Sequence, residues 1–569
     1  MPAPAPYTLR HETVAANLLR QAQTQPQGEA AVYLTHQRRY SWAELGRQTD
    51  LVAAGFAALG VRPGDHIAIW GTNVPQWLLT QLAAARLGAV LVTINPEWKS
   101  AEVRYAIHQS DTRLLVMMPG FEKASAGKIH HYDYLAILRD LLPEVEARDP
   151  RAPLHSEDFP ALRQLVLTSG SAPGLLSWEQ MLDEGLSMEA TTLETYFAQV
   201  RPEDPAMIQY TSGTTGFPKG AVLTHTNIVN NALAVATHMR LTAADRVCAP
   251  VPYYHCFGSI LFNLACVVSG ATMIVPADTF EPDATLKAAA EERATALYGV
   301  PTMFIAELAS PSFKSYDLSS LRTGIIAGAP VDSELMTAVN EQMGATEMTI
   351  AYGLTEASPV THQTLPEDSF ARRTETVGRA IPHTEARIVD PGTLETLPPG
   401  EVGEIWVKGF HVMQGYYQKP KETADAIVDG WLRTGDLGTL DEDGYYRIVG
   451  RLKEMLIVGG HNVYPAEVEQ ALHHLLEDKV EMLQVVGLPH PRLQEVTALA
   501  VKCRPGETLT LEEVQARCAD KLEWPKIPRY LEVMDDFSPV MTVTGKIQKF
   551  RLRDHLCEVF DLNPKAPTA

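Results

Sequence analysis

Residues 65–117 read DHIAIWGTNVPQWLLTQLAAARLGAVLVTINPEWKSAEVRYAIHQSDTRLLVM, and short apolar runs in this stretch alternate with longer amphipathic ones. The apolar runs predict buried strands, and the stretches between them have the periodicity of helices. The predicted elements are, in order, Asp65–Trp70, Pro75–Leu87, Ala89–Ile94, Ala101–Gln109 and Thr112–Met117. Strands that alternate with helices are typical of parallel βαβ units. This stretch therefore predicts an α/β fold with helices on both faces of a parallel sheet.

Outside this stretch the same pattern continues and then changes. Residues 119–160 are polar and predict a surface excursion, after which helix and strand signals alternate again from about residue 206 to 361. From Ala386 to Gly450, short strands separated by Pro and Gly turns predict a small antiparallel β subdomain. We therefore predict a large N-terminal domain over residues 1–450, a hinge at 451–453 and a mobile, compact α+β domain over 454–569.

The composition is that of an ordinary globular protein. Hydrophobic residues make up 45% of the 569 residues and charged residues 21%, which excludes a disordered or fibrous chain. Asp and Glu total 69 against 48 Lys and Arg, so the formal net charge is -21. Such a surface repels nucleic acid at long range, and we expect no nucleic-acid partner. The sequence gives no indication of the oligomeric state.

Cysteine usage and hydropathy predict a cytoplasmic protein with no integral membrane segment. The six cysteines form no CxxC pair and no cluster with zinc spacing, so we expect reduced thiols. The most apolar long run, Ile260–Pro276, is too short and too polar for a membrane span. The N-terminal residues have no charged segment followed by an apolar one, as a signal peptide would.

The densest chemical signal is TSGTTGFPKG at residues 211–220. An apolar strand, Ala206–Tyr210, leads into it, and a helical pattern follows it. Three glycines, four hydroxyls and Lys219 suit an anion cradle, because glycine lets backbone N–H groups approach phosphate oxygens. The stretch is not a Walker A loop, since Phe217 and Pro218 separate Gly216 from Lys219. The competing interpretation is an ordinary turn between a strand and a helix.

Six stretches resemble the signatures of the adenylate-forming acyl-CoA synthetases, a family related to luciferases and to peptide-synthetase adenylation domains. They are TSGTTGFPKG at 211–220, AYGLTE at 351–356, RTGD at 433–436, GRLK at 450–453, VGGHNVYP at 458–465 and VTGK at 543–546. The resemblance covers nearly the whole chain. It implies an enzyme that joins a small carboxylic acid to coenzyme A, with ATP as co-substrate and Mg²⁺ as cofactor.

The resemblance assigns most of the nucleotide contacts. For the phosphates it implies Thr211, Ser212, Gly213, Thr214, Thr215, Gly216 and Lys219. For adenine and ribose it implies Gly328, Ala329, Pro330, Tyr352, Gly353, Asp436 and Arg451. The chemistry of two residues agrees with this. Asp436 offers two acceptor oxygens to the paired hydroxyls of a ribose, and Arg451 carries a rigid donor fork suited to ribose or phosphate. The alternatives are a turn aspartate and, for Tyr352, a core tyrosine.

The catalytic residues implied by the resemblance are Lys546, Glu356, Thr355 and His255. Glu356 suits Mg²⁺, a hard cation that takes few protein carboxylates together with phosphate oxygens. Lys546 would bring a charge on the mobile domain to the reacting groups; without the resemblance it would be an exposed turn lysine. Thr355 is expected at the α-phosphate and His255 near the acid's carboxylate, although His255 also suits a structural role.

The remaining assignments concern the acid, the thiol and the hinge. Within the family, several stretches look most like the medium-chain branch sometimes called acyl-CoA synthetase family member 2, among them PYYHCFGS at 252–259 and VGRAIPHTEARI at 377–388. This implies an acyl pocket lined by Tyr254, His255, Val300, Thr302 and Gly353. We expect the pantetheine arm of CoA to pass Gly459 and Gly460, or else these glycines form only a turn before a helix. Lys453 is the predicted hinge residue.

Four functions remain open from the sequence. The leading one is a medium-chain fatty acid–CoA ligase that forms AMP. The second is an adenylating enzyme for another acid, whether short branched, thioether, dicarboxylic or aryl, or one that loads the thiol of a carrier protein. A luciferase-like oxidase has no support in the sequence. A non-catalytic nucleotide-binding scaffold is disfavoured, because Lys546, Glu356 and Asp436 are all present.

Overall fold

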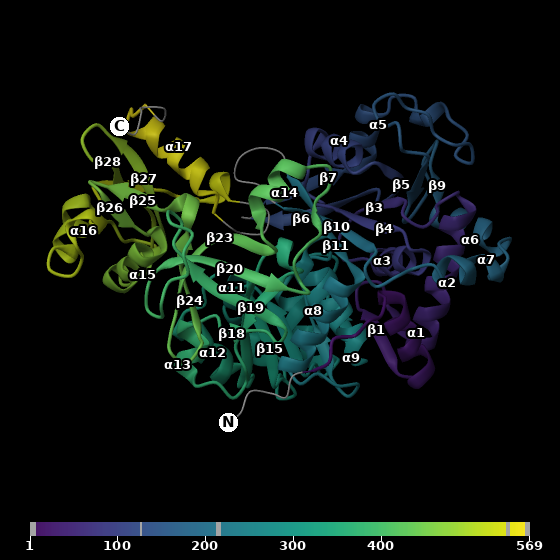
Figure 1. Cartoon of the computed structure of the whole chain (residues 1–569), viewed down its shortest axis with the longest axis horizontal. Helices are drawn as coiled ribbons and strands as arrows, with labels where there is room; N and C mark the ends of the chain where they lie inside the picture. Colours follow the sequence, from purple (N-terminus) through teal and green to yellow (C-terminus); the bar gives the residue numbers. More distant parts are fainter. Residues whose placement is uncertain (1–6, 126–127, 212–217, 542–546, 564–569) are drawn as a thin grey trace. The chain divides into compact units, whose positions relative to one another are not determined.

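The computed structural model describes residues 7–125, 128–211, 218–541 and 547–563 (Figure 1). Internal contacts divide the chain into two compact units. The first comprises Met1–Glu385 with Val407–Leu432, and the second comprises Ala386–Trp406 with Arg433–Ala569. Both are mixtures of helices and strands, and the first contains two large sheets. The predicted α/β class is confirmed.

One sheet of the first unit has eight strands in the order β21-β11-β10-β4-β3-β5-β8-β9. Its strands are β3 (His66–Trp70), β4 (Val90–Ile94), β5 (Thr112–Met117), β8 (Gln164–Leu167), β9 (Leu176–Ser177), β10 (Pro205–Thr211), β11 (Lys219–Thr224) and β21 (Gly415–Tyr416). Neighbours from β10 to β9 are parallel, whereas β11 and β21 join the edge in antiparallel register. Most residues of these strands are apolar and buried, as expected for a sheet covered on both faces.

The other sheet has nine strands in the order β18-β17-β16-β15-β14-β12-β13-β1-β2. Its strands are β1 (Glu29–Tyr33), β2 (Arg38–Ser41), β12 (Arg246–Cys248), β13 (Thr272–Val275), β14 (Ala296–Gly299), β15 (Thr323–Ala327), β16 (Glu347–Gly353), β17 (Val360–Gln363) and β18 (Arg379–Ala380). The strands from β16 to β1 are parallel, and antiparallel strands close both edges. A hydrophobic core packs around β14, β15 and β16.

Helices cover these sheets. Their bounds are α1 (Val14–Thr24), α2 (Trp42–Ala58), α3 (Pro75–Leu87), α4 (Ser100–Gln109), α5 (Tyr134–Leu141), α6 (Trp178–Leu186), α7 (Ala190–Phe197), α8 (His225–His238), α9 (Ala265–Ser269), α10 (Pro282–Glu291), α11 (Pro301–Leu308), α12 (Ser333–Gln342), α13 (Phe370–Glu375) and α14 (Pro420–Ala426). The helix α8 contacts β11 of one sheet and β17 of the other. The helix α3 begins at Pro75 and ends at Leu87, and Gly88, which caps it, is left-handed with φ 72°.

Local signals located several elements well but missed some strands. The bounds of α3 and β5 match the predicted ranges to the residue. The helix predicted after the glycine-rich loop is present as α8, but an unpredicted strand, β11, precedes it and pairs with β10 as a hairpin. The apolar run of this strand, Ala221–Leu223, is only three residues long and gives a weak strand signal. The polar stretch also holds a hairpin, β6 (Gly120–Ser125) with β7 (Lys128–Asp133).

The second unit contains a four-stranded path β26-β25-β28-β27, with β29 added beside β28. The strands are β25 (Leu456–Val458), β26 (His461–Val463), β27 (Val480–His490), β28 (Gln494–Cys503) and β29 (Tyr530–Val533), and the helices are α15 (Pro465–Leu476), α16 (Leu511–Cys518) and α17 (Lys549–Val559). Residues of α15 and α16 pack into one apolar cluster of this sheet, and residues of α17 pack into another. These strands and helices give the region the compact α+β character that the sequence predicted.

Short strands precede this region, where the sequence predicted a β subdomain. They are β19 (Thr384–Val389), β20 (Gly403–Gly409), β22 (Ile427–Val428), β23 (Trp431–Leu440) and β24 (Tyr446–Arg451). The division between the two units falls within β19, β20 and β23. Arg451 is the last residue of β24, and Lys453 lies in the short 3₁₀ helix η5 (Leu452–Glu454). The predicted hinge and domain boundary at 450–454 concern motion, and they stay a prediction.

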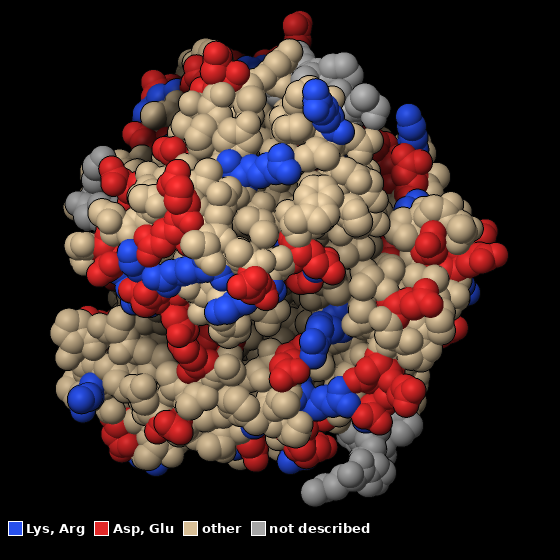
Figure 2. Space-filling model, turned by 90° about the vertical axis from the view of Figure 1, so that its left-hand side faces the viewer, with Lys and Arg blue, Asp and Glu red and all other residues tan. Residues whose placement is uncertain are grey.

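The expectations about membrane spans and cysteines can be compared with the described residues. Among them, no helix is both long and apolar enough to cross a membrane. All six cysteines are free. On the face that Figure 2 shows, acidic and basic side chains are interspersed over short distances, so the excess of acidic residues does not gather there in one patch.

Candidate active site

The carboxyl ends of three neighbouring parallel strands carry predicted site residues. Val300 follows β14, Gly328 follows β15, and Gly353 ends β16. A Cβ built at Gly328 would lie 3.3 Å from Cγ1 of Val300, so these two loops touch. Gly328 has φ +88°, a conformation that favours glycine, and residues 328–330 are exposed. Ligands of open α/β sheets bind at this edge, and the structure brings the predicted adenine and acyl segments together there.

The turn after β16 carries Thr355 and Glu356 in the 3₁₀ helix η4 (Thr355–Ala357). Gly353 is required at this point, because a Cβ there would lie 1.8 Å from the carbonyl oxygen of Pro359. The ring of Tyr352 is half-buried and lies 5.8 Å from the ring of His362. Burial lowers the pKa of His362 to about 3, so its ring is neutral at physiological pH. The close approach of Gly353 to Pro359 thus fixes the turn, and Thr355 and Glu356 on it are half-buried.

His255 lies beside this turn. The Sγ atom of Cys256 is 3.6 Å from Nδ1 of His255 and 3.9 Å from Oγ1 of Thr355. The backbone N–H of Phe257 donates to Nδ1 at 3.2 Å, which orients the ring. These contacts place His255 next to Thr355, although the two residues are 100 positions apart in the sequence. Cys256 was not among the predicted site residues.

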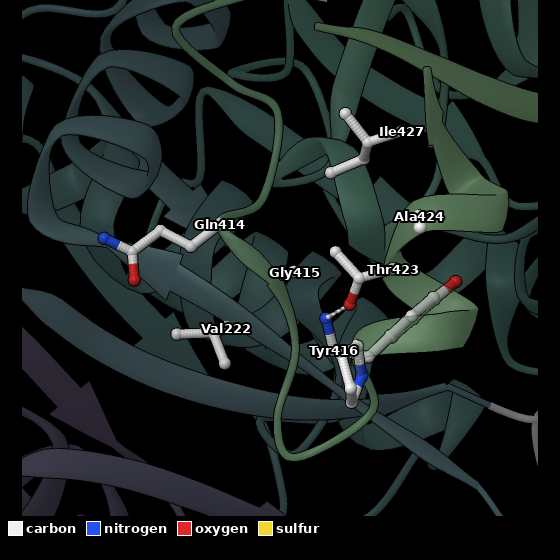
Figure 3. Close-up of a pocket in the computed structure, with 8 residues that line it drawn as sticks. Val222, Gln414, Gly415, Tyr416, Thr423, Ala424 and Ile427 are labelled. Atoms are coloured by element: carbon white, nitrogen blue, oxygen red, sulfur yellow. Dashed lines mark hydrogen bonds between the residues drawn. The ribbon is translucent and has the colours of Figure 1, made fainter. Parts of the chain in front are cut away.

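A second residue that sequence reasoning missed is Tyr416, on β21. Its hydroxyl donates to Oε1 of Glu356 at 2.7 Å, and the ammonium of Lys219 lies 4.0 Å from its ring centroid. Its backbone N–H donates to Oγ1 of Thr423 at 2.9 Å, and both residues line the surface hollow of about 450 Å³ in Figure 3. Tyr416 thus joins the predicted metal ligand to the predicted phosphate-binding lysine. An aromatic residue after a glycine gave no sequence signal for this role.

The phosphate-binding loop is described only at its ends. Thr211 and Lys219 pair across the β10–β11 hairpin, and Oγ1 of Thr211 donates to the carbonyl of Lys219 at 3.4 Å. Ser212, Gly213, Thr214, Thr215 and Gly216 lie outside the described residues, as does Lys546. Their predicted roles are therefore taken up below as proposals.

The predicted ribose-binding residues lie in the second unit. Asp436 and Arg451 face each other across the β23–β24 ladder, with 3.1 Å between Oδ1 and Nε. Asp436 is 6% exposed, whereas the Arg451 side chain is 55% exposed. The backbone N–H of Asp436 donates to Oγ1 of Thr434, which in turn donates to the carbonyl of Ile405. Asp436 is thus a buried hydrogen-bond acceptor, and Arg451 is an exposed donor beside it.

Glu404 on β20 holds this turn and was also missed. Its side chain is 1% exposed. Oε1 accepts the backbone N–H of Gly435 at 3.1 Å, and Oε2 accepts from Arg433 at 3.0 Å and from the Trp406 indole at 2.8 Å. A buried carboxylate with three donors is strongly positioned. A lone glutamate in the apolar run GEIWVKG was the available signal.

The thiol-stage glycines occupy the turn between β25 and β26. Gly459 and Gly460 both have positive φ, at +59° and +85°. A Cβ on Gly459 would lie 2.9 Å from the indole of Trp524, which is 48% exposed and lies edge-on to the ring of His461. The turn therefore has little free space on the side of Gly459, where the partly exposed indole of Trp524 lies.

The remaining predicted residues belong to the acyl pocket and the metal site. Tyr254 and Val300 are half-buried, while Thr302 is exposed on α11. Among the described residues, no group of three His, Cys, Asp or Glu side chains could hold a metal ion by itself. Glu356 is half-buried and one of its oxygens accepts the Tyr416 hydroxyl. A single oriented carboxylate fits Mg²⁺ that shares its shell with phosphate oxygens and water.

Loops at the carboxyl edge of a parallel sheet, a lysine beside a glycine-rich hairpin and an oriented carboxylate define a nucleotide-binding α/β protein. A family model described as AMP-binding enzyme matches residues 18–417, and the chain belongs to this family. The family predicted from the six signatures is confirmed.

Relatives and solved structures match nearly end to end. YngI of Bacillus subtilis (strain 168), provisionally named an acyl-CoA synthetase, is 44% identical over 557 residues, covering 98% of this chain and 99% of the relative. The mitochondrial medium-chain acyl-CoA ligase ACSF2 of Bos taurus is 39% identical, covering 96% and 88%. The structure of ATP-bound MatB from Rhodopseudomonas palustris superposes with a TM-score of 0.81 at 26% identity, covering 97% and 100%.

Proposed function

We propose that this chain is an ATP-dependent, AMP-forming ligase that joins a carboxylic acid to coenzyme A. In the first half-reaction a carboxylate oxygen attacks the α-phosphorus of ATP, and pyrophosphate leaves. In the second, the CoA thiol attacks the acyl carbonyl, the thiol proton is released, and AMP leaves. Adenylation is needed because a free carboxylate has no good leaving group.

The observation that carries this proposal is the convergence of predicted site residues on one edge of the nine-stranded sheet. Val300, Gly328 and Gly353 lie at the carboxyl ends of three adjacent strands, and His255 is linked to Thr355 through Cys256. A carboxylate and the α-phosphate of ATP must meet in one place, and this edge brings together polar groups and the half-buried Val300. The names of the relatives support CoA as the thiol.

Each site residue has a proposed task. Thr211, Lys219 and the loop between them bind the phosphates, Asp436 and Arg451 bind the ribose, and Thr355 contacts the α-phosphate. Lys546 stabilises the charge that develops during adenylation. Glu356 would hold Mg²⁺, which offsets phosphate charge when it is bound.

We propose a medium-chain fatty acid as the substrate. The support is the name of the mammalian relative, together with the half-buried, apolar Val300 at the end of β14. We also propose a cytoplasmic location, supported by six free cysteines. His255, Tyr254 and Thr302 are proposed to line the acyl pocket, and Gly459 and Gly460 the thiol passage.

The decisive experiment measures pyrophosphate release from ATP with the purified chain. Straight-chain acids of graded length are tested with and without CoA, and reactions without acid are the control. We expect acid-dependent pyrophosphate release, with CoA needed for product turnover and a maximum at intermediate chain length. Absence of acid-dependent release with every acid would favour a non-catalytic scaffold. Turnover that needs a carrier protein in place of CoA would overturn only the assignment of the thiol.

A further inference from the structure

Three side chains from three different elements form one contact chain in the first unit. Lys219 comes from β11, Tyr416 from β21 and Glu356 from η4. The lysine ammonium lies 4.0 Å from the tyrosine ring centroid, and the tyrosine hydroxyl lies 2.7 Å from Oε1 of Glu356. The tyrosine therefore meets the two charged residues through two different parts of its side chain.

Backbone contacts fix this tyrosine in place. Tyr416 pairs with Ala221 across the β21–β11 ladder, and its N–H is bonded to Thr423. The backbone N–H of the next residue, Tyr417, donates to the carbonyl oxygen of Gly220 at 2.8 Å. Its side chain is 7% exposed. The ring is thus a rigid spacer rather than a flexible surface group.

The same segment is also tied to the carboxylate's own backbone. The N–H of Met413 donates to the carbonyl oxygen of Glu356 at 2.9 Å. The phenol hydroxyl is a hydrogen-bond donor at neutral pH, and its partner here is Oε1 of Glu356. A hydrogen bond to Oε1 restricts rotation of the carboxylate and fixes the direction of the other oxygen.

We propose that Tyr416 is a positioning residue with two separable effects: its hydroxyl orients Glu356 toward Mg²⁺, and its ring holds the Lys219 ammonium for the phosphates of ATP. This inference rests on the proposed function and adds a residue that no signature contains. Partners that orient a metal ligand commonly change metal affinity by about 10- to 100-fold. The contact between the Lys219 ammonium and the ring is expected to have a smaller effect on binding than the metal-ligand contact, because cation–π attraction is weak where the cation is partly exposed.

Two substitutions separate the effects. Tyr416→Phe removes the hydroxyl and keeps the ring, whereas Tyr416→Leu removes both. Binding of ATP is measured by calorimetry, first in EDTA and then across a Mg²⁺ titration, with no acid present so that no turnover occurs. We expect Tyr416→Phe to bind metal-free ATP like the wild type but to need roughly tenfold more Mg²⁺ for half-saturation. Tyr416→Leu should also weaken metal-free binding, by about threefold.

A double substitution tests whether the hydroxyl acts through the carboxylate. In a Glu356→Gln background the metal effect of Tyr416→Phe should disappear, because the group that it orients is gone. Tyr417→Phe is the matched control: its hydroxyl also donates to a carboxylate, that of Asp111 at 2.9 Å, outside the cluster. This control should leave both binding measurements unchanged.

Several results would overturn the inference. An unchanged Mg²⁺ midpoint for Tyr416→Phe would exclude the orienting role, and equal effects in the Glu356→Gln background would show that it does not act through Glu356. An equal loss of metal-free binding in the Phe and Leu variants would exclude the separate role of the ring. A wild-type chain that binds no ATP with or without Mg²⁺ would instead refute the proposed function, which keeps the two failures distinct.

Discussion

Asp436 combines burial with an ion pair. The residue is 6% exposed, and its Oδ1 lies 3.1 Å from Nε of Arg451, which fixes the orientation of the carboxylate. A ribose presents two adjacent hydroxyl donors, which a fixed carboxylate can accept together. The geometry around this residue makes a direct test of its role possible.

Replacing Asp436 by alanine should weaken ATP binding without unfolding the chain. Hydrogen bonds to a charged group are worth roughly 1.5–3 kcal/mol, which corresponds to about tenfold to over a hundredfold in affinity. Arg451 is half-exposed and can be hydrated when its partner is removed. Calorimetric titration with ATP measures the effect, with the exposed turn residue Asp443→Ala as the control. Equal affinities for the two variants would contradict the ribose assignment.

Glu307 is a carboxyl group that the proposed chemistry does not use. It lies on α11, is 1% exposed, and its Oε2 has no hydrogen-bond partner within the described part of the chain. Burial raises the pKa of this carboxyl well above its usual range, so the folded chain keeps a proton that the unfolded chain loses above about pH 4.5. Stability tied to this group therefore falls as the pH rises from there.

We predict that Glu307→Met changes this pH dependence. The free energy of unfolding of the variant, relative to the wild type, should increase between pH 5 and pH 7 by up to about 1.4 kcal/mol per pH unit. Urea unfolding at several pH values measures it. The exposed Glu341→Gln is the control and should track the wild type. If the Glu307→Met and wild-type curves run parallel, Glu307 is ionised in the folded chain.

At the scale of elements, the β25–β26 turn offers a matched pair of glycines. Both have positive φ, so alanine is strained at either position by about 1–3 kcal/mol. Only at Gly459 would the new Cβ also meet the Trp524 indole at 2.9 Å; no described atom lies within 4 Å of a Cβ at Gly460. The two positions therefore separate backbone strain from steric contact.

Gly459→Ala is expected to lower the unfolding temperature more than Gly460→Ala does. Adding Trp524→Ala should reduce the excess, because the indole contact is specific to the Gly459 variant; Cδ2 of Leu493, 3.1 Å from the same Cβ, retains part of it. Thermal unfolding of the four variants tests this. An equal effect of Trp524→Ala in both backgrounds would mean that the contact is unimportant.

For the whole molecule, four buried histidines link stability to pH. Burial lowers the pKa of His225, His238 and His411 to about 4 and that of His362 to about 3. The unfolded chain takes up these protons near pH 6.5. Between pH 6.5 and pH 4 the unfolded state therefore binds more protons, and stability is lost as the pH falls.

We predict that the unfolding temperature drops steadily from about pH 6.5 to pH 4 and that His411→Gln makes the drop shallower. Both ring nitrogens of His411 lack hydrogen-bond partners among the described residues, so the ring contributes mainly through its lost protonation. The exposed His473→Gln is the control. Identical slopes for His411→Gln and the wild type would contradict the prediction. Glu307 changes stability with pH in the opposite direction, but it contributes one proton and the four histidines contribute four.

The proposed two-step reaction also makes a prediction for the whole chain. Lys546 and the Gly459–Gly460 turn lie in the same predicted C-terminal domain, and our proposal assigns them to different half-reactions. We expect this domain to rotate if it presents both to one centre, with Lys453 as the predicted hinge, where proline would restrict φ. Lys546→Ala should lose adenylation by at least about 10²-fold and still convert supplied acyl-adenylate to thioester. Lys453→Pro should form acyl-adenylate and then stall. Single-turnover assays of each half-reaction decide this; equal damage to both halves by Lys546→Ala would refute rotation.

The sequence by itself determined what depends on neighbouring residues. Alternating periodicity located α3 and β5 to the residue, and glycine-rich or acidic signatures identified the family before any contact was known. Such patterns are local, because helix and strand periods and turn chemistry are set within a few positions. The same locality explains why β11 was missed: its apolar run, Ala221–Leu223, is only three residues long and gives a weak strand signal by itself.

Only the tertiary structure decided which distant residues meet. Tyr416 reaches Glu356 and Lys219 because β21 adds to the edge beside β11, and Glu404 fixes the Asp436 turn because β20 lies beside β23. Nothing in the sequence around a tyrosine or a strand glutamate specifies such partners. Strand order is set by the burial of whole faces of a sheet, and that is a property of the complete chain.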